Sequence, residues 1–392
     1  MRLMLDLLMA GNGIYLDYAS TTFTRAEVVK EMQPYFTEKF GNPSSLHAMG
    51  KEARAAVEMS REKIRKILNA EVADSLIFTS TGTESINLAI LGVARALKGK
   101  GKHIVTSTIE HKAVLETCKY LADKEGYRIS YVSVGKNGLI NPEDVARVIT
   151  EETILVSIMY ANNEIGTIQP IAEIGSLVRA KKVYFHTDAC QAASFLNLDV
   201  KMLNVDLMTI NSGKIYGPKG VGLLYARENL SLLPLSYGGG QEEGLRSGTE
   251  NVPGIVGFAR ALELVQDERE KEGKRLMGLR DKLIRGLLEK VPNCKLNGDA
   301  AMRLANNVNI TFFGVEGEVL LQYLNNAGIY VSSGSACTAY SIKASHVLIA
   351  LGLNEKDAMG SVRFTLGKKT TEKDIEKVLE VVPGIVESLR KV

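Results

Sequence analysis

The stretch Val205-Asp-Leu-Met-Thr-Ile-Asn211-Ser-Gly-Lys214-Ile-Tyr-Gly217-Pro-Lys-Gly220-Val-Gly222 decides how the rest of the chain is interpreted. An apolar, β-branched run at residues 205–210 stops at Asn-Ser-Gly, and a second apolar run follows at residues 221–226, which predicts two strands around a turn. Lys214 then lies where a strand ends. At such a position in an α/β sheet a side chain faces the ligand crevice, and a partly desolvated lysine can form a Schiff base. The alternative is that Lys214 or Lys219 is an ordinary turn lysine in solvent.

Length and composition limit the class of protein. The chain has 392 residues, of which 45% are hydrophobic, so two domains are expected. The net charge is only +3 and no Lys/Arg block stands out, which argues against nucleic-acid binding. The apolar start, residues 1–10, contains Asp6 and is too short for a membrane span or a standard signal sequence, so a cytoplasmic protein is expected. Four cysteines without CxxC spacing suggest neither a disulfide framework nor a zinc site.

Strand-length apolar runs alternate with helical patterns through the first 226 residues. Strands are expected at 76–79, 103–108, 129–134, 153–160 and 183–188, and helices at 25–39, 49–69, 86–97, 111–125 and 170–182. In a right-handed βαβ array this alternation predicts a mostly parallel sheet. Five of the strands are followed by polar side chains, namely Thr83, His111, Asn163, Asp188 and Lys214. Because such strand ends share one edge of the sheet, a ligand site is expected there.

The junction Ser80-Thr81-Gly82-Thr83-Glu84-Ser85 carries two interpretations. A strand, a Ser/Thr/Gly turn and a helix in succession present backbone N–H groups and hydroxyls to an anion, and the helix dipole favours a phosphate. Thr81 with Glu84 three residues later also fits a plain capping box. Both remain open at this point, and the chain has neither GxxxxGK[ST] nor GxGxxG.

The C-terminal third does not continue the regular alternation of strands and helices. Residues 255–290 are predicted as a long, charged helix that bridges two domains. Beyond it we expect strands at 307–312 and 330–333, and helices at 316–326 and 372–390, the last capped by Thr371 and Asp374. The expected organisation is a large domain, residues 15–260, and a smaller α+β domain, residues 261–392, with residues 1–14 either packed on the smaller domain or disordered.

The candidate site residues form a set suited to pyridoxal phosphate. Lys214 would hold the aldehyde, and Asp188 would pair with the pyridinium nitrogen and keep the ring an electron sink. The turn at residues 81–83 would anchor the phosphate. Taken singly, Asp188 also fits a strand-end cap and His111 a helix N-terminal residue, so the residue types alone leave the choice open.

From Tyr15 to the C-terminus, the chain resembles the cysteine desulfurases. These enzymes are relatives of the class V aminotransferases, and they supply sulfur for iron–sulfur clusters. The motifs that carry this resemblance are Tyr15-Leu-Asp-Tyr-Ala-Ser-Thr-Thr22, Phe40-Gly-Asn-Pro-Ser-Ser45, Glu110-His-Lys-Ala-Val114, Ala161-Asn-Asn-Glu-Ile-Gly166, His186-Thr-Asp-Ala-Cys-Gln191, Lys214-Ile-Tyr-Gly-Pro-Lys-Gly220, Arg246-Ser-Gly-Thr249, Ser332-Ser-Gly-Ser-Ala-Cys-Thr338 and Val362-Arg-Phe-Thr-Leu-Gly367. It implies an aspartate aminotransferase-like fold, the fold of pyridoxal phosphate-dependent transferases, with a large domain around a mostly parallel sheet and a smaller α+β domain.

The resemblance also implies a role for each matching residue. Lys214 would form the Schiff base with pyridoxal phosphate and later move the Cα proton, while His111 would stack on the ring and take part in acid–base steps. The residues that would hold the cofactor are Gly82, Thr83, His111, Asn163, Asp188, Gln191, Asn211, Gly213 and Lys214, with Thr249 reaching the phosphate from the other subunit of a homodimer. Arg363 and Asn42 would bind the substrate carboxylate.

Cys337 would accept the sulfur. Its thiolate would attack the sulfur of bound L-cysteine, which leaves a persulfide on the enzyme and releases L-alanine. The polar sequence Ser-Ser-Gly-Ser-Ala before Cys337 is typical of an accessible loop, and a nucleophilic cysteine needs exposure. Cys190 is expected to be a packing residue. The expected partners are L-cysteine, a second copy of the chain, and an iron–sulfur scaffold or another sulfur acceptor; no resident metal, nucleic acid or membrane is expected, and the only metal contact foreseen is a transient iron–sulfur cluster at Cys337.

One departure from the family pattern concerns the cofactor. The family usually has Ser-Xaa-His-Lys where this chain has Asn211-Ser-Gly213-Lys214, so an imidazole that binds the phosphate is missing. The Asn211 amide and the Gly213 backbone N–H are expected to replace this imidazole in part. The cofactor is then expected to bind more weakly than in family members that have the histidine. The alternatives to a desulfurase are a selenocysteine lyase, another class V aminotransferase, or a weakly active sulfur carrier or assembly partner.

Overall fold

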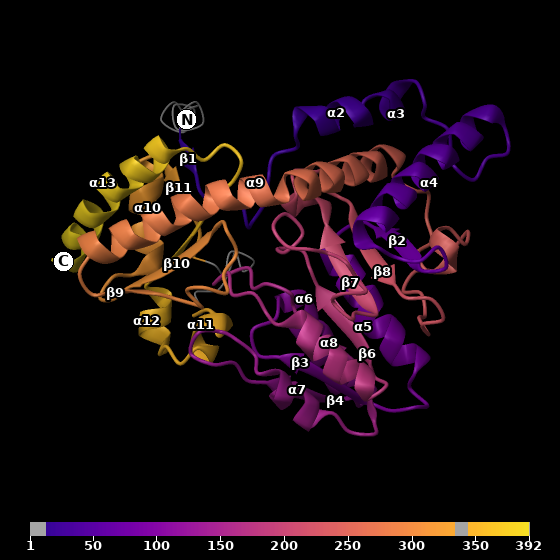
Figure 1. Cartoon of the computed structure of the whole chain (residues 1–392), viewed down its shortest axis with the longest axis horizontal. Helices are drawn as coiled ribbons and strands as arrows, with labels where there is room; N and C mark the ends of the chain where they lie inside the picture. The colour runs from indigo at the N-terminus through magenta and orange to yellow at the C-terminus, as the bar shows by residue number, and fades with distance from the viewer. Residues whose placement is uncertain (1–12, 334–343, 392) are drawn as a thin grey trace.

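The computed structural model describes residues 13–333 and 344–391 (Figure 1). The first part of the chain forms β1 (Ile14–Tyr15), α2 (Ala26–Met32), α3 (Pro34–Thr37), α4 (Ala48–Leu68), β2 (Ser75–Thr79), α5 (Gly82–Ala96), β3 (His103–Ser107), α6 (Lys112–Glu125), β4 (Arg128–Val132), α7 (Pro142–Val148), β5 (Thr153–Ser157), α8 (Ile171–Ala180), β6 (Tyr184–Asp188), β7 (Leu207–Asn211) and β8 (Gly222–Ala226). The second part forms α9 (Val252–Lys290), β9 (Cys294–Leu296), β10 (Asn307–Phe312), α10 (Gly317–Asn326), β11 (Ile329–Tyr330), α11 (His346–Ala350), α12 (Glu355–Met359), β12 (Ser361–Thr365) and α13 (Glu372–Arg390).

The large sheet has the strand order β2-β8-β7-β6-β5-β3-β4. Strands β7, β6, β5, β3 and β4 are parallel, and β8 runs antiparallel to both of its neighbours. The mostly parallel sheet predicted from the alternating pattern is therefore confirmed. The carboxyl ends of β3, β5, β6 and β7 lie at one edge, which is where ligands bind in sheets of this kind.

Both faces of the large sheet are buried. Alternate residues of a strand point to opposite faces, so in β5 the side chain of Leu155 packs with α5 and α6 while that of Val156 packs with α4, α8 and the start of α9. The continuous apolar sequence Thr-Ile-Leu-Val of β5 is the composition expected of a strand covered on both sides. This burial fixes the register of the strands and hence the positions of their ends.

The C-terminal part has its own sheet and core. Strands β12, β10 and β9 form an antiparallel sheet, and the short strand β1 pairs in parallel with β11. Their apolar side chains pack with α10, α13 and the second half of α9. Helix α13 begins with the predicted capping box, because Thr371 Oγ1 accepts from the Asp374 N–H and the Asp374 carboxylate accepts from the Thr371 N–H.

Helix α9 joins the two cores. Its early residues Phe258 and Leu262 pack in the core of the large sheet, whereas Leu283 and Leu287 pack in the C-terminal core. The domain boundary that we expected near residue 260 therefore falls inside a continuous helix. Figure 1 shows this helix (orange) running from one part of the molecule to the other.

Two further findings refine the sequence predictions. The helix expected at 25–39 is divided into α2 and α3, because Pro34 starts a new turn after Gln33. Leu16 packs in the C-terminal core, directly after β1, which pairs with β11. Within residues 13–333 and 344–391, no helix is both long and apolar enough to cross a membrane.

Candidate active site

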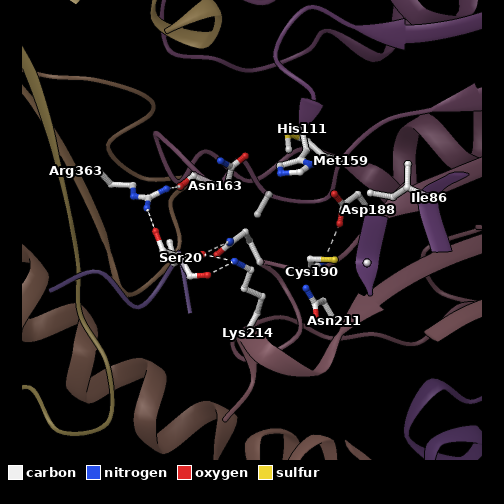
Figure 2. Close-up of a pocket in the computed structure, with 14 residues that line it drawn as sticks. Ser20, Ile86, His111, Met159, Asn163, Asp188, Cys190, Asn211, Lys214 and Arg363 are labelled. Atoms are coloured by element: carbon white, nitrogen blue, oxygen red, sulfur yellow. Dashed lines mark hydrogen bonds between the residues drawn. The ribbon is translucent and has the colours of Figure 1, made fainter. Parts of the chain in front are cut away.

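A cavity of about 190 Å³ opens at the carboxyl edge of the large sheet (Figure 2). The predicted site residues that line it are Gly82, His111, Asn163, Asp188, Gln191, Asn211, Lys214 and Arg363. The first seven lie at or just after the carboxyl ends of β2, β3, β5, β6 and β7, while Arg363 comes from β12 of the C-terminal sheet. The structure therefore brings together, from positions up to 281 residues apart, most of the side chains that the sequence singled out.

Lys214 closes a short 3-10 turn, Ser212–Lys214, directly after β7. Its Nζ lies in the cavity and donates hydrogen bonds to the backbone carbonyls of Ala19 (2.8 Å) and Ser20 (2.5 Å). The amine is thus held by the N-terminal segment of the chain, and Figure 2 shows it pointing toward Ser20. The alternative of an ordinary solvent lysine is excluded by this placement.

Asp188 is the last residue of β6 and is buried at the floor of the cavity. One carboxylate oxygen accepts a hydrogen bond from the Cys190 backbone N–H at 2.9 Å. Opposite it, α5 begins at Gly82, where a Cβ atom would lie only 2.9 Å from Cys190 Sγ. A glycine is needed here because any side chain would collide with the wall of the cavity. Because Gly82 has no side chain, the helix N-terminus can approach a ligand closely.

His111 caps α6 and lines the same cavity. Its Nδ1 accepts a hydrogen bond from the Ala113 N–H at 3.1 Å, so in the neutral ring the proton lies on Nε2. His111 therefore both caps the N-terminus of α6 and lines the candidate site.

The neighbouring Glu110 is fully buried beneath the site. It accepts hydrogen bonds from Ser107 Oγ (2.6 Å) and the Met159 N–H (3.0 Å). Burial, with a smaller contribution from the charge of Asp188, raises the pKa of Glu110 to about 8. The carboxyl group is consequently mostly protonated and neutral at pH 7.

The turn before Lys214 shows how the chain manages without the usual imidazole. Asn211 Oδ1 accepts the Gly213 backbone N–H at 3.2 Å, so this N–H is used inside the turn. The Nδ2 of Asn211 lies on the Gly82 side of the cavity, 3.6 Å from the position of a Cβ on Gly82. Of the two groups expected to replace the imidazole, Asn211 lines the cavity and Gly213 does not.

Arg363 lies on the side of the cavity that faces the C-terminal sheet and is 3% exposed. Its guanidinium donates to the Asn163 carbonyl (2.9 Å), to Asp17 Oδ1 (2.8 Å) and to Ser20 Oγ (2.8 Å). These contacts hold a buried cation at the edge of the cavity. Such a group binds a carboxylate in a planar, directional way.

Four of the predicted residues do not line this cavity. Thr83 is exposed and lines a neighbouring surface groove with His111. Thr249 is also exposed, and Asn42 uses its side-chain oxygen to accept the Ser44 N–H at 2.9 Å. The fourth is Gly213, as described above. Cys337 lies outside the described residues.

Sequence reasoning missed several residues of the site. Ala19 and Ser20 contact Lys214, and Cys190, expected as packing, lines the cavity. Burial raises the pKa of the Cys190 thiol well above its usual range, so Cys190 is held as a neutral thiol. The available signals were the position of Cys190 two residues after Asp188, and the small polar run after Tyr18.

The lining of the cavity suits pyridoxal phosphate. An amine (Lys214), a buried carboxylate (Asp188) and a helix N-terminus (Gly82) are the three groups that would meet the aldehyde, the ring nitrogen and the phosphate of this cofactor. Among residues 13–333 and 344–391, no group of three or more His, Cys, Asp or Glu side chains is arranged to hold a metal ion.

The sequence matches the family described as aminotransferase class V over residues 14–378. A relative named cysteine desulfurase IscS, from Clostridium botulinum (strain Hall), is 50% identical over 380 residues, which cover 96% of this chain and 95% of the relative. A second relative of the same name, from Methanosarcina thermophila, is 50% identical over 377 residues, covering 96% and 93% of the two chains.

Solved structures give the same picture. A protein titled NifS-like superimposes with a TM-score of 0.90 at 38% identity, covering 96% of this chain and all of the other. A structure titled SspA in complex with cysteine superimposes with a TM-score of 0.80 at 35% identity, covering 90% and 98% of the two chains. The similarity therefore extends over both cores and both sides of the cavity.

Proposed function

The chain belongs to the aminotransferase class V family, and we propose that it is a pyridoxal phosphate-dependent cysteine desulfurase, an enzyme that converts L-cysteine to L-alanine and passes the sulfur to Cys337. The observation that carries the proposal is the cavity in which Lys214, Asp188 and Arg363 meet. The cofactor, when bound, supplies an electron sink that weakens the Cα–H bond and the bond from Cβ to sulfur of the substrate.

The chain's own groups supply binding and proton transfer. Arg363 binds the α-carboxylate of L-cysteine, and the Asp188 carboxylate keeps a proton on the ring nitrogen. The Nζ of Lys214 takes the proton from Cα, with His111 as a second acid–base group whose Nε2 carries the proton in the neutral ring. The other proposed cofactor contacts that line the cavity are Gly82, Asn163, Gln191 and Asn211. Thr83 and Gly213, proposed as further cofactor contacts, and Asn42, proposed as a second carboxylate ligand, rest on the resemblance alone, because they do not line it.

The sulfur acceptor is assigned by elimination. Burial raises the pKa of Cys118 to about 12 and also raises the pKa values of Cys190 and Cys294, so none of these three is a stabilised thiolate. Cys337 remains. Cys337 follows Ser333 by four residues in the sequence and lies outside the described residues.

Both ends of the segment that carries Cys337 are attached to the walls of the cavity. On one side Ser332 forms two backbone hydrogen bonds with Arg363, at 3.2 and 2.6 Å. On the other side Ser345 Oγ donates to Glu164, next to Asn163, at 2.5 Å. The thiolate of Cys337 attacks the sulfur of the bound substrate, the Cβ–S bond breaks, and the carbon fragment takes up a proton and leaves as L-alanine.

The proposal extends to the setting of the enzyme. The relatives named cysteine desulfurase IscS support the proposed delivery of sulfur to iron–sulfur cluster assembly or another acceptor protein. A cytoplasmic setting and a transient cluster ligand at Cys337 are proposed from the sequence. The exposed Thr249, which does not line its own cavity, supports a homodimer in which this residue completes the phosphate site of the partner. The two domains are proposed as residues 15–260 and 261–392, with residues 1–14 on the smaller one.

Replacement of Cys337 by alanine tests the function. The Cys337→Ala variant should keep the visible absorption of the bound cofactor and lose sulfide release from L-cysteine, while the control Cys294→Ala keeps both. Normal sulfide release by Cys337→Ala would contradict the proposal. Transfer of an amino group to a keto acid by the same variant would indicate an aminotransferase instead.

A further inference from the structure

Asp17, Ser20 and Arg363 form a hydrogen-bonded triangle at the edge of the cavity. Asp17 Oδ1 accepts from Ser20 Oγ at 2.8 Å and from Arg363 at 2.8 Å, and Ser20 Oγ accepts from Arg363 at 2.8 Å. Figure 2 shows Ser20 between Arg363 and Lys214. The two cations of the site are therefore connected through one short N-terminal segment, residues 17–20.

The guanidinium of Arg363 has five N–H donors, and its hydrogen bonds to Asn163, Asp17 and Ser20 use three of them. Its NH1 and NH2 groups are bound to Asn163, Asp17 and Ser20, whereas Nε is buried and has no hydrogen-bond partner among the described residues. Because Nε is closed off, a carboxylate in the cavity would bind the guanidinium through a terminal nitrogen. The orientation of the terminal nitrogens depends on Asn163, Asp17 and Ser20, which bind them.

Asp17 itself stands behind the cavity. Ser20 and Arg363 line it and Asp17 does not. Asp17 is fixed by a bridge to Thr365 of β12, the strand that carries Arg363, and the following residue Tyr18 donates to the Thr365 carbonyl at 3.3 Å. Any effect of Asp17 on a ligand is therefore exerted through Arg363.

We propose that Asp17 and Ser20 are positioning residues that hold the Arg363 guanidinium in the orientation that binds the α-carboxylate of an amino acid. This inference rests on the proposed function. Two physical effects oppose each other here, because Asp17 orders the guanidinium but also offsets its charge. If ordering dominates, removal of Asp17 weakens carboxylate binding; if competition for the charge dominates, removal strengthens it.

The test compares two ligands that differ by the carboxylate alone. L-alanine and ethylamine are titrated into the cofactor-loaded enzyme, and binding is followed by the change in cofactor absorption. Ordering one long side chain is worth about three- to tenfold in affinity. Asp17→Ala and Ser20→Ala should each weaken L-alanine binding by that factor and leave ethylamine binding within about twofold of the wild type.

Two further variants separate position from charge and from stability. Asp17→Asn keeps an acceptor oxygen without the charge, so it should restore L-alanine binding to within about twofold. Asp281→Ala removes the carboxylate partner of another buried arginine, Arg280, away from the cavity, and should change neither ligand. Unfolding midpoints of all variants verify that they are folded.

Three outcomes would overturn the inference. Equal weakening of both ligands would show a general structural defect, tighter L-alanine binding by Asp17→Ala would show competition, and unchanged binding would show that the triangle is dispensable. A wild-type protein that takes up no cofactor would instead overturn the proposed function, and this inference with it.

Discussion

The two walls of the cavity are built in different ways. On the wall formed by the large sheet, Asp188 is the last residue of β6 and Lys214 follows three residues after β7, so both side chains are placed by where a strand ends. On the opposite wall Arg363 lies in the middle of β12, and its direction is set by Asp17 and Asn163, which are 346 and 200 residues away in the chain. The first wall is encoded locally, and the second depends on contacts between distant segments.

The largest effect is expected on the first wall. Lys214→Ala removes both the covalent partner of the cofactor and the base for the Cα proton, so kcat/KM for L-cysteine should fall by at least about 10⁴-fold. Sulfide release and the absorption spectrum measure the two losses. The control is Lys219→Ala, since Lys219 Nζ donates to the Thr22 carbonyl outside the cavity. If the activity of Lys214→Ala stayed within tenfold of the wild type, Lys214 would not have the role proposed for it on the first wall.

The support of the first wall should be sensitive to acid. His186 is buried in β6 between Ser157 (2.8 Å) and Thr209 (3.0 Å), and burial lowers its pKa to about 4. The unfolded chain binds this proton near pH 6.5, so stability from the neutral ring is present above pH 6.5 and is lost as the pH falls toward 4. The loss is about 3 kcal/mol in the free energy of unfolding.

Urea unfolding at pH 7.5, 5.5 and 4.5 measures this dependence. In His186→Gln, the free energy of unfolding should depend less on pH, because the contribution of this side chain is lost. The contributions of the other titratable groups should remain. Identical pH slopes for the variant and the wild type would show that His186 does not link acid to the stability of the sheet.

The second wall is tested by Arg363→Lys. A lysine keeps the charge but has three donors instead of five, so binding Asn163, Asp17 and Ser20 leaves none for the substrate. We expect kcat/KM to fall about 10- to 100-fold, mainly through KM. Steady-state kinetics with L-cysteine measure the change. Arg390→Lys is the control, because that guanidinium binds the backbone carbonyls of residues 292, 293 and 313 away from the site. A fall in kcat with KM unchanged would contradict the assigned role.

The smallest effect concerns the core behind the second wall. Thr371→Ala removes the capping box of α13 and should lower the free energy of unfolding by about 1 kcal/mol without changing activity at 25 °C. Denaturant titration measures it. Ser388→Ala, which removes a hydroxyl bonded to the Gly384 carbonyl within the same helix, should cost less. A large loss of activity in Thr371→Ala would mean that a small loss of stability in the C-terminal core displaces Arg363 on the second wall.

This difference explains how much the sequence could predict. The alternating pattern predicted the large sheet and the residues at its edge, because apolar periodicity and strand ends are local properties. Some boundaries differed for local reasons: β5 was expected to reach residue 160 but ends at Ser157, since the continuing apolar residues form the loop that leads to Asn163. The strand that carries Arg363, β12, was not among the expected strands, although the motif that contains Arg363 was recognised.

The contacts of Asp17 and Ser20 could not be predicted. They were included in a motif, yet nothing in a short run of small polar residues shows that it will pair with an arginine 343 or more residues later. Asn42 and Thr249 illustrate the converse, because a motif names a residue without stating which cavity it lines. Long-range packing decides both cases.

The triangle of Asp17, Ser20 and Arg363 has a consequence for biosynthesis. Residues 17–20 leave the ribosome first, but their arginine is translated 343 residues later, which at ordinary rates is roughly 20 to 70 s. Lys214 is translated 149 residues before Arg363, so for roughly 7 to 30 s of that interval the nascent large domain holds Lys214 with an unfinished wall. Cofactor loaded onto the growing chain would therefore meet the amine before the enzyme can select amino acids by their carboxylate.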